Sequence, residues 1–159
     1  MPDQESLLER LIRHRVEFVI VGGFAAVAHG ASLLTRDVDI CCRFTPDNLL
    51  RLQEAVADLH PVHRMTTRRL PLALTRESCA RFNNLYLDTD FGPLDCLGNV
   101  LAIGDYDEVE KQSIQIKLPA GPCRVLGLDA LSKAKQAMGR PHDKIAVMQL
   151  RAIRERTQP

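Results

Sequence analysis

Two aspartates separated by one residue are the most informative feature of the sequence. Asp37 and Asp39 lie in the run Asp37-Val38-Asp39-Ile40, which alternates polar and apolar residues as a β-strand does. Because residues two apart in a strand project from the same face, the two carboxylates are expected side by side, with Val38 and Ile40 in the core. Adjacent anions repel, and a shared cation relieves that repulsion. The pair therefore predicts a metal site.

A third carboxylate is expected to join this pair from a later strand. Asp95 lies between apolar neighbours and can project from the opposite face to them. Two rivals are less suitable, because Asp90 lies in a turn and Asp88 shares its face with Tyr86, a face expected to point to solvent. Three converging carboxylates can hold two Mg²⁺ ions about 4 Å apart, the arrangement used for in-line phosphoryl transfer.

A pair of glycines precedes the acidic segment. Gly22-Gly23 follows the β-branched run 18–21, which has the pattern of a buried strand, and precedes the alanine-rich stretch 24–29, which has the pattern of a short helix. Glycines between a strand and a helix let backbone N–H groups approach a phosphate, and the helix dipole favours its charge. The order strand, Gly-Gly, helix, Asp-x-Asp strand therefore indicates a triphosphate site beside the metal site.

Together these motifs resemble the nucleotidyltransferase superfamily that includes DNA polymerase β. The chain looks most similar to the small bacterial members associated with toxin–antitoxin and abortive-infection systems. The family pattern is a hydrophobic residue with two small residues, then Asp-x-Asp, then a third acid. Val21-Gly22-Gly23, Asp37-Val38-Asp39 and Asp95 match it. Lys133 and the segment 139–144 also resemble this group, and the resemblance extends over residues 18–150.

The resemblance implies both a fold and an activity. The fold is α/β of the α+β kind, with a mixed β-sheet flanked by helices. The activity is Mg²⁺-dependent, with Mn²⁺ as a possible substitute, and moves a nucleoside monophosphate from a nucleoside triphosphate to a hydroxyl. The resemblance assigns metal binding and catalysis to Asp37, Asp39 and Asp95, and nucleotide binding to Gly22, Gly23 and Lys133.

The motifs leave the acceptor open. The segment 61–82 has no counterpart in the family pattern and is expected to select the acceptor, with tRNA or a partner protein favoured over a small molecule. Its arginines fit either a polyanion-binding surface or a solvated face; they are Arg64, Arg68, Arg69, Arg76 and Arg81. The alternative function is a non-catalytic nucleotide-binding or antitoxin-type partner-binding module on the same fold. Such a module has no need of three mutually repulsive carboxylates.

Length and composition predict one nucleotidyltransferase-like domain over residues 1–159. The chain is 45% hydrophobic and 26% charged, near the values of globular domains. It has no apolar run long enough for a membrane span, and its acidic amino terminus is unlike a secretory signal, so a cytoplasmic location is expected. The five cysteines include no C-x-x-C pair and are expected to be reduced, mostly buried thiols.

Charge is segregated along the chain although the net charge is only +1. Residues 83–110 hold seven carboxylates and no lysine or arginine, whereas 60–81 holds five arginines and one acid. A metal centre beside a phosphate-binding surface would produce this pattern, and solvated faces produce it too.

Hydrophobic periodicity predicts the elements that carry these residues. An amphipathic helix is expected to begin near Asp3 or Ser6. Further helices are expected over 24–29, 45–59, 105–111, 128–138 and 141–154, and strands over 18–21, 37–42, 84–89, 94–97, 113–118 and 123–126. The segment 61–82 is expected to be mostly loop, with one strand near Met65.

Overall fold

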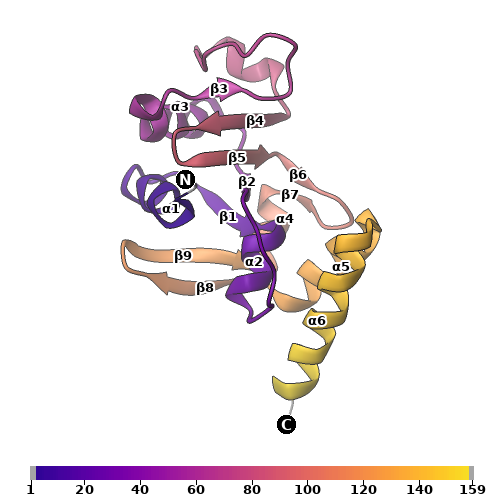
Figure 1. Cartoon of the computed structure of the whole chain (residues 1–159). Helices are drawn as coiled ribbons and strands as arrows, with labels where there is room; N and C mark the ends of the chain where they lie inside the picture. The colour runs from indigo at the N-terminus through magenta and orange to yellow at the C-terminus, as the bar shows by residue number, and fades with distance from the viewer. Residues whose placement is uncertain (1–2, 158–159) are drawn as a thin grey trace.

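The strands form a mixed sheet that runs through the molecule. In the computed structural model, which describes residues 3–157, seven strands lie in the order β3-β4-β5-β2-β1-β9-β8, and β6 and β7 pair separately (Figure 1). The strands are β1 (Phe18–Val21), β2 (Val38–Cys42), β3 (Val62–His63), β4 (Asn84–Thr89), β5 (Gly92–Leu97), β6 (Asn99–Val100), β7 (Gly104–Asp105), β8 (Ser113–Leu118) and β9 (Gly121–Leu126). The pairs β1–β9 and β2–β5 are parallel, and the other neighbouring pairs are antiparallel.

Helices flank this sheet. They are α1 (Gln4–Arg13), α2 (Gly22–Ala28), α3 (Pro46–Val56), α4 (Tyr106–Lys111), α5 (Leu128–Met138) and α6 (Pro141–Thr157). α1 packs against α3 and β9, while α2 packs against β1, β2, β9, α5 and α6. Figure 1 shows α6 projecting beyond the sheet toward the carboxyl end of the chain. The predicted mixed sheet flanked by helices is confirmed.

Side-chain caps explain where several helices begin. Asp3 accepts a hydrogen bond from the Ser6 N–H at the start of α1, and Thr45 accepts one from Asn48 at the start of α3. Asp105 accepts one from Glu108 at the start of α4. Each of these side chains satisfies an N–H that has no partner within its helix.

The core lies between the sheet and the helices. It includes Ile20 of β1, Ile40 of β2 and Leu94 of β5, all with 0% exposure. α1 contributes Leu7, Leu8 and Leu11 at helical spacing, so its apolar stripe is buried as the sequence predicts. The five cysteines are buried free thiols. The core therefore holds β1, β2 and β5 at fixed register, which fixes the side chains at their ends.

The structure corrects several expected elements. The strand expected near Met65 lies instead at Val62–His63, where it pairs with β4, and Met65 is exposed in the loop that follows. α2 begins at Gly22, so the glycines are the first residues of the helix and not a turn before it. Short 3₁₀ helices at Ala57–Leu59 and Ser78–Arg81, and the β6–β7 pair, were not predicted, because two to four residues carry no periodicity. Among residues 3–157, no helix has the length and apolar character needed to span a membrane.

Candidate active site

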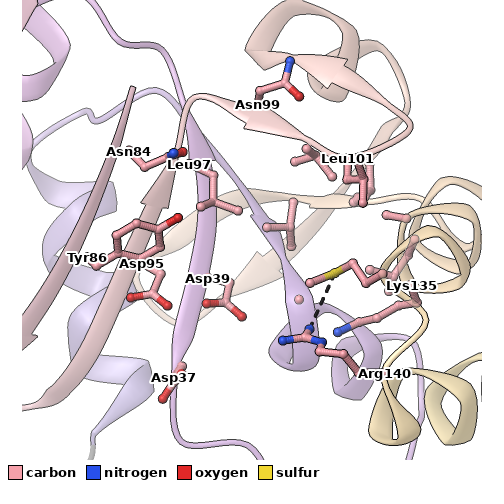
Figure 2. A pocket seen from close by; sticks show the side chains of 17 residues that line it. Asp37, Asp39, Asn84, Tyr86, Asp95, Leu97, Asn99, Leu101, Lys135 and Arg140 are labelled. Atoms are coloured by element: carbon pink, nitrogen blue, oxygen red, sulfur yellow. Dashed lines mark hydrogen bonds between the residues drawn. The ribbon is translucent and has the colours of Figure 1, made fainter. Parts of the chain in front are cut away.

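Three carboxylates meet where β2 and β5 lie side by side. Parallel pairing places Asp39 directly opposite Asp95, and Asp37 lies two residues before Asp39. One carboxylate oxygen from each of the three lies within 4.8 Å of the others. Figure 2 shows them together on one wall of a cleft, with Lys135 and Arg140 across from them. The predicted convergence of Asp37, Asp39 and Asp95 is thus present in the structure.

Asp39 packs against the backbone of Gly22. Gly22 has φ of +73°, a conformation that L side chains rarely adopt, and a Cβ built there would lie 2.2 Å from Asp39 Oδ2. Burial raises the pKa of Asp39 to about 7, and the charges of Asp95 and Asp37 add to this effect while Lys135 opposes it. Gly22 is therefore needed for the space that the Asp39 carboxylate occupies, and that carboxylate is costly to ionise without a cation.

Asp95 has a cationic partner in Arg64. The Asp95 side chain is 13% exposed, and Arg64 Nη2 donates a hydrogen bond of 2.9 Å to its Oδ2. The same nitrogen lies 2.7 Å from Oδ1 without directing an N–H at it, so buried Oδ1 accepts no hydrogen bond from residues 3–157. The Arg64 backbone N–H donates to the carbonyl of Tyr86, the residue paired with Asp95, which places Arg64 at this end of the site.

The donor set fits a hard divalent cation. Three carboxylates within 4.8 Å of one another supply oxygen ligands, and Asp95 Oδ1 has an open lone pair. Mg²⁺ and Mn²⁺ favour such oxygen donors, and a cation would offset the repulsion that raises the pKa of Asp39.

The carboxylates border a cleft of about 440 Å³ with a largely apolar helical wall. Leu131, Ala134 and Met138 of α5 lie along this wall, together with Leu101. Polar groups at the other side include Asn84, Tyr86 and Asn99, which Figure 2 labels. Apolar walls with a few polar groups and a volume of roughly 300–1,000 Å³ are typical of small-molecule sites.

A second, more polar cavity of about 280 Å³ adjoins the first. It is lined by Gly23, Thr35, Arg36 and His142, and it shares Asp37, Asp39, Lys135 and Arg140 with the larger cleft. Lys135 is nearly buried, with 9% of its side chain exposed, whereas Arg140 is 49% exposed. The acidic cluster thus lies at the junction of an apolar cleft and a basic cavity.

Lys133 does not reach this junction. It is exposed on α5 and is absent from the lining of both cavities, whereas Lys135 lines both. The difference follows from helix geometry, because Leu131, Ala134, Lys135 and Met138 share one face and Lys133 lies off it. The spacing of these four residues by three and four positions is visible in the sequence. That spacing does not show which face of α5 lines the cleft.

Other lining residues were missed for a similar reason. The face of β4 expected to point to solvent instead lines the cleft at Asn84 and Tyr86, because Tyr86 pairs with Asp95 in the sheet. Asp88, farther along this face, pairs with Arg69. Arg64 was predicted only as part of the arginine-rich surface and Arg140 only within the segment 139–144, because their contacts with Asp95 and Asp143 are not visible in the sequence.

The arginine-rich segment carries less free charge than its composition suggests. Arg64 pairs with Asp95, Arg69 with Asp88 and Arg76 with Asp47. Arg68 and Arg81 are exposed and have no ion pair with residues 3–157. The expected arginine surface is thus divided between internal ion pairs and two unpaired side chains.

Comparison with solved structures identifies the fold. No family model and no curated protein sequence matches the chain. Seven solved chains match, among them a candidate nucleotidyltransferase from Thermotoga maritima with 15% identity, covering 94% of this chain and 89% of that one, at a TM-score of 0.55. Another is ANT(2")-Ia in complex with adenylyl-2"-tobramycin, with 14% identity, 96% and 95% coverage, and a TM-score of 0.54. Both likenesses extend over nearly the whole of each chain, and the fold of this protein is therefore the nucleotidyltransferase fold.

Proposed function

We propose that the protein is a metal-dependent nucleotidyltransferase that moves a nucleoside monophosphate from a nucleoside triphosphate to a hydroxyl acceptor. The observation that carries this proposal is the meeting of Asp37, Asp39 and Asp95 at the junction of the apolar cleft and the basic cavity. A triphosphate bound across that junction would have its reacting phosphate at the carboxylates. Its base would then lie in the apolar cleft, and its leaving phosphates would lie in the basic cavity.

The three carboxylates would hold a pair of divalent cations, Mg²⁺ or Mn²⁺. Asp37 and Asp39 reach both cavities, whereas Asp95 lines only the larger cleft, beside Tyr86. Bound metal would lower the pKa of the acceptor hydroxyl and neutralise charge on the phosphate that is transferred. We therefore place the acceptor hydroxyl on the Asp95 side of the site.

The basic cavity would hold the β- and γ-phosphates and then the departing pyrophosphate. Arg36, Lys135 and Arg140 line it and supply positive charge, and Gly23 leaves the backbone uncovered by a side chain. Anions are bound best where several charged donors converge and where the site excludes most water. We assign Gly22 the further task of leaving room for Asp39, and we transfer the lysine role from Lys133 to Lys135.

The larger cleft would hold the nucleoside. Leu131, Ala134 and Met138 offer an apolar surface for the flat base, and the amides of Asn84 and Asn99 can hydrogen-bond to its edge or to the ribose. These groups do not by themselves select one base. The preferred base must therefore be found by comparing transfer from all four nucleoside triphosphates.

We place tRNA or a protein first among acceptors. The loop that follows β3 begins with Arg64 at Asp95 and continues through exposed Arg68, so a large anionic acceptor could contact both the cleft and this loop. The adenylylated tobramycin bound to ANT(2")-Ia makes a small hydroxylated molecule the next candidate.

The experiment that tests the proposal is a labelling reaction. Purified protein, Mg²⁺ and each of the four α-labelled nucleoside triphosphates are incubated with total RNA, with cell protein or with a panel of hydroxylated small molecules. We expect label on one acceptor class, stoichiometric release of pyrophosphate and no label with Asp39→Asn. Absence of transfer to every class, under conditions in which the protein is folded and binds nucleotide, would contradict the proposal.

One observation favours a non-catalytic module as the second candidate. Arg64 already compensates the charge of Asp95, so part of the acidic cluster is stabilised by the chain itself. A module that binds a partner without turnover could keep the cluster in this state. A stable complex with a partner protein that forms without nucleotide or metal, together with no transfer, would support this reading.

A further inference from the structure

A fourth buried carboxylate lies behind the cations of the basic cavity. Asp143, in the first turn of α6, is 0% exposed. Its Oδ2 accepts hydrogen bonds from Arg140 Nε at 2.6 Å and from the Arg140 backbone N–H at 3.2 Å, and its Oδ1 accepts one from Arg140 Nη2 at 3.2 Å. Lys135 Nζ lies 3.6 Å from Oδ1 and His142 Nε2 lies 3.8 Å from it. Asp143 is absent from the lining of both cavities.

The surroundings of Asp143 keep it ionised. Burial alone would raise the pKa of its carboxyl, but hydrogen bonds from Arg140 and the charges of Arg140 and Lys135 lower that pKa on balance. A buried charge is tolerated only when it is paired and hydrogen-bonded, and Asp143 meets both conditions. In return it supplies the negative charge that a nearly buried lysine needs.

The geometry leaves both cations with unused donors. Arg140 uses Nε and Nη2 on Asp143, and its Nη1 has no hydrogen bond to residues 3–157. The 3.6 Å separation between Lys135 Nζ and Asp143 is too long for a strong hydrogen bond, so the ammonium keeps donors for another partner. The same two side chains line both cavities, across from Asp37 and Asp39 (Figure 2).

We propose that Asp143 is a positioning residue that holds Lys135 and Arg140 toward the β- and γ-phosphates and so makes the site select a triphosphate. The inference rests on the proposed function, because it takes the basic cavity to be the phosphate end of that site. Asp143 touches neither cavity and acts through the two cations. Removing its charge frees Arg140 to turn to solvent and takes from Lys135 the carboxylate that lies 3.6 Å from its Nζ, so both cations can move away from the phosphate position.

Direct binding separates this role from a general loss of structure. The probes are inorganic tripolyphosphate, which engages only the phosphate end, and AMP, which lacks the β- and γ-phosphates, each titrated calorimetrically in Mg²⁺. We expect Asp143→Asn to weaken tripolyphosphate binding about tenfold, the loss of one charge-assisted contact, and to change AMP binding less than about twofold. Asp129→Asn is the matched control, because Asp129 pairs α5 to α6 through Arg154 but lines neither cavity. It should leave both affinities unchanged.

A double-mutant cycle makes the test stricter. If Asp143 acts through Arg140, Asp143→Asn should weaken tripolyphosphate binding much less in an Arg140→Gln background than in the wild type. Equal binding of tripolyphosphate by folded wild-type and Asp143→Asn proteins would overturn the positioning role. Equal weakening of AMP and tripolyphosphate would also overturn it, since that result indicates a structural defect.

Further measurements distinguish a folding defect, a failure of the proposed function and a failure of the role of Asp143. If Asp143→Asn does not fold, Asp143→Glu is used instead, because it keeps the charge on a longer side chain. We then expect native stability with weaker tripolyphosphate binding. Unchanged tripolyphosphate binding by Asp143→Glu would overturn the positioning role. If wild-type protein binds neither tripolyphosphate nor any nucleoside triphosphate, the proposed function fails. If wild type binds both and Asp143→Asn binds equally well, only the role of Asp143 fails.

Discussion

The two ends of the cleft pair cations with carboxylates in opposite ways. At the basic end, Lys135 and Arg140 are held by Asp143, a fully buried carboxylate that lines neither cavity. At the other end, Arg64 is held by Asp95, which belongs to the acidic cluster itself. In the first case the anion is structural and the cations stay available to a ligand. In the second case the cation neutralises a group that a metal ion would need.

This difference predicts opposite consequences for metal binding. Arg64 already compensates the negative charge of Asp95 through its bond to Oδ2, so it stabilises the metal-free cluster and disfavours metal binding, although Oδ1 keeps an open lone pair. Lys135 and Arg140 have their own counterion, so they add positive charge without using a metal ligand. We expect substitutions at the two ends to affect different measurements.

The largest effect should separate Asp95 from Asp88, which lies on the neighbouring strand of the same hairpin. Asp95→Asn removes a metal ligand, and metal stabilisation of phosphoryl transfer is worth several kcal/mol, so the transfer rate should fall by about 10³-fold. Asp88→Asn, on the neighbouring strand, removes only the partner of Arg69 and should change the rate less than about threefold. Single-turnover transfer measures both. Comparable losses in the two variants would show that Asp95 has no special role.

A methyl group at Gly22 should have the next largest effect. Gly22→Ala places a Cβ 2.2 Å from Asp39 Oδ2 and must displace that carboxylate, so transfer should fall by about 10²-fold, or about 3 kcal/mol. Gly30→Ala is the control, because Gly30 also has a positive φ, of +109°, but its Cβ would meet no atom closer than 3.8 Å. Gly30→Ala should have a lower melting temperature than the wild type but the same transfer rate. An active Gly22→Ala protein would mean that Asp39 does not need its observed position.

Neutralising one arginine at each end of the cleft should change metal binding at one end and triphosphate binding at the other. Arg64→Gln removes the competitor for Asp95, so nucleotide-free protein should bind Mn²⁺ about three- to tenfold more tightly, or about 1 kcal/mol. Arg140→Gln should weaken triphosphate binding and change nucleotide-free Mn²⁺ affinity less than about twofold. Electron paramagnetic resonance titration of free Mn²⁺ measures both variants. Weaker Mn²⁺ binding by Arg64→Gln would show that Arg64 orients Asp95 for the metal and does not compete with it.

The smallest effect concerns pH and the metal-free protein. The pKa of Asp39 is raised to about 7 in the folded state, mainly by burial, from a usual value of 3.8. A raised folded pKa contributes stability that is complete below the unfolded pKa and is lost as pH rises through about 7. Metal-free protein should therefore lose a few degrees of melting temperature from pH 6 to pH 8. Asp39→Asn should lack this part of the pH dependence, and an identical dependence in both proteins would contradict the assignment.

The parts of the site that could be predicted from the sequence are those set by neighbouring residues. Asp37 and Asp39 were expected on one face because strand geometry places residues two apart on the same side. The strand begins at Val38, one residue later than expected, and the two carboxylates still converge. The glycines before that strand were informative because a glycine pair that follows a strand and opens a helix matches a known order of elements. The mixed sheet followed from the same resemblance.

The remaining residues depend on register and on helix rotation, which the sequence does not display. Tyr86 lines the cleft because it pairs with Asp95 across β4 and β5, and alternation in β4 alone leaves two faces to choose from. Lys135 and Lys133 differ in position by only two residues on α5, and only the packing of that helix against α2 and α6 decides which lysine faces the cleft. Asp143 is polar, so no hydrophobic pattern predicts that it is buried.

The number of metal ions bound per chain shows whether the three carboxylates form a metal site. Wild-type protein and Asp39→Asn are titrated with Mn²⁺ in the presence of a nucleoside triphosphate whose α,β-bridging oxygen is replaced by methylene, so that transfer cannot occur. We predict two Mn²⁺ ions per wild-type chain, as expected for a two-metal site, and at least about 100-fold weaker binding by Asp39→Asn. If the wild-type protein binds no Mn²⁺, or if Asp39→Asn binds it as tightly, then the three carboxylates are not a metal site.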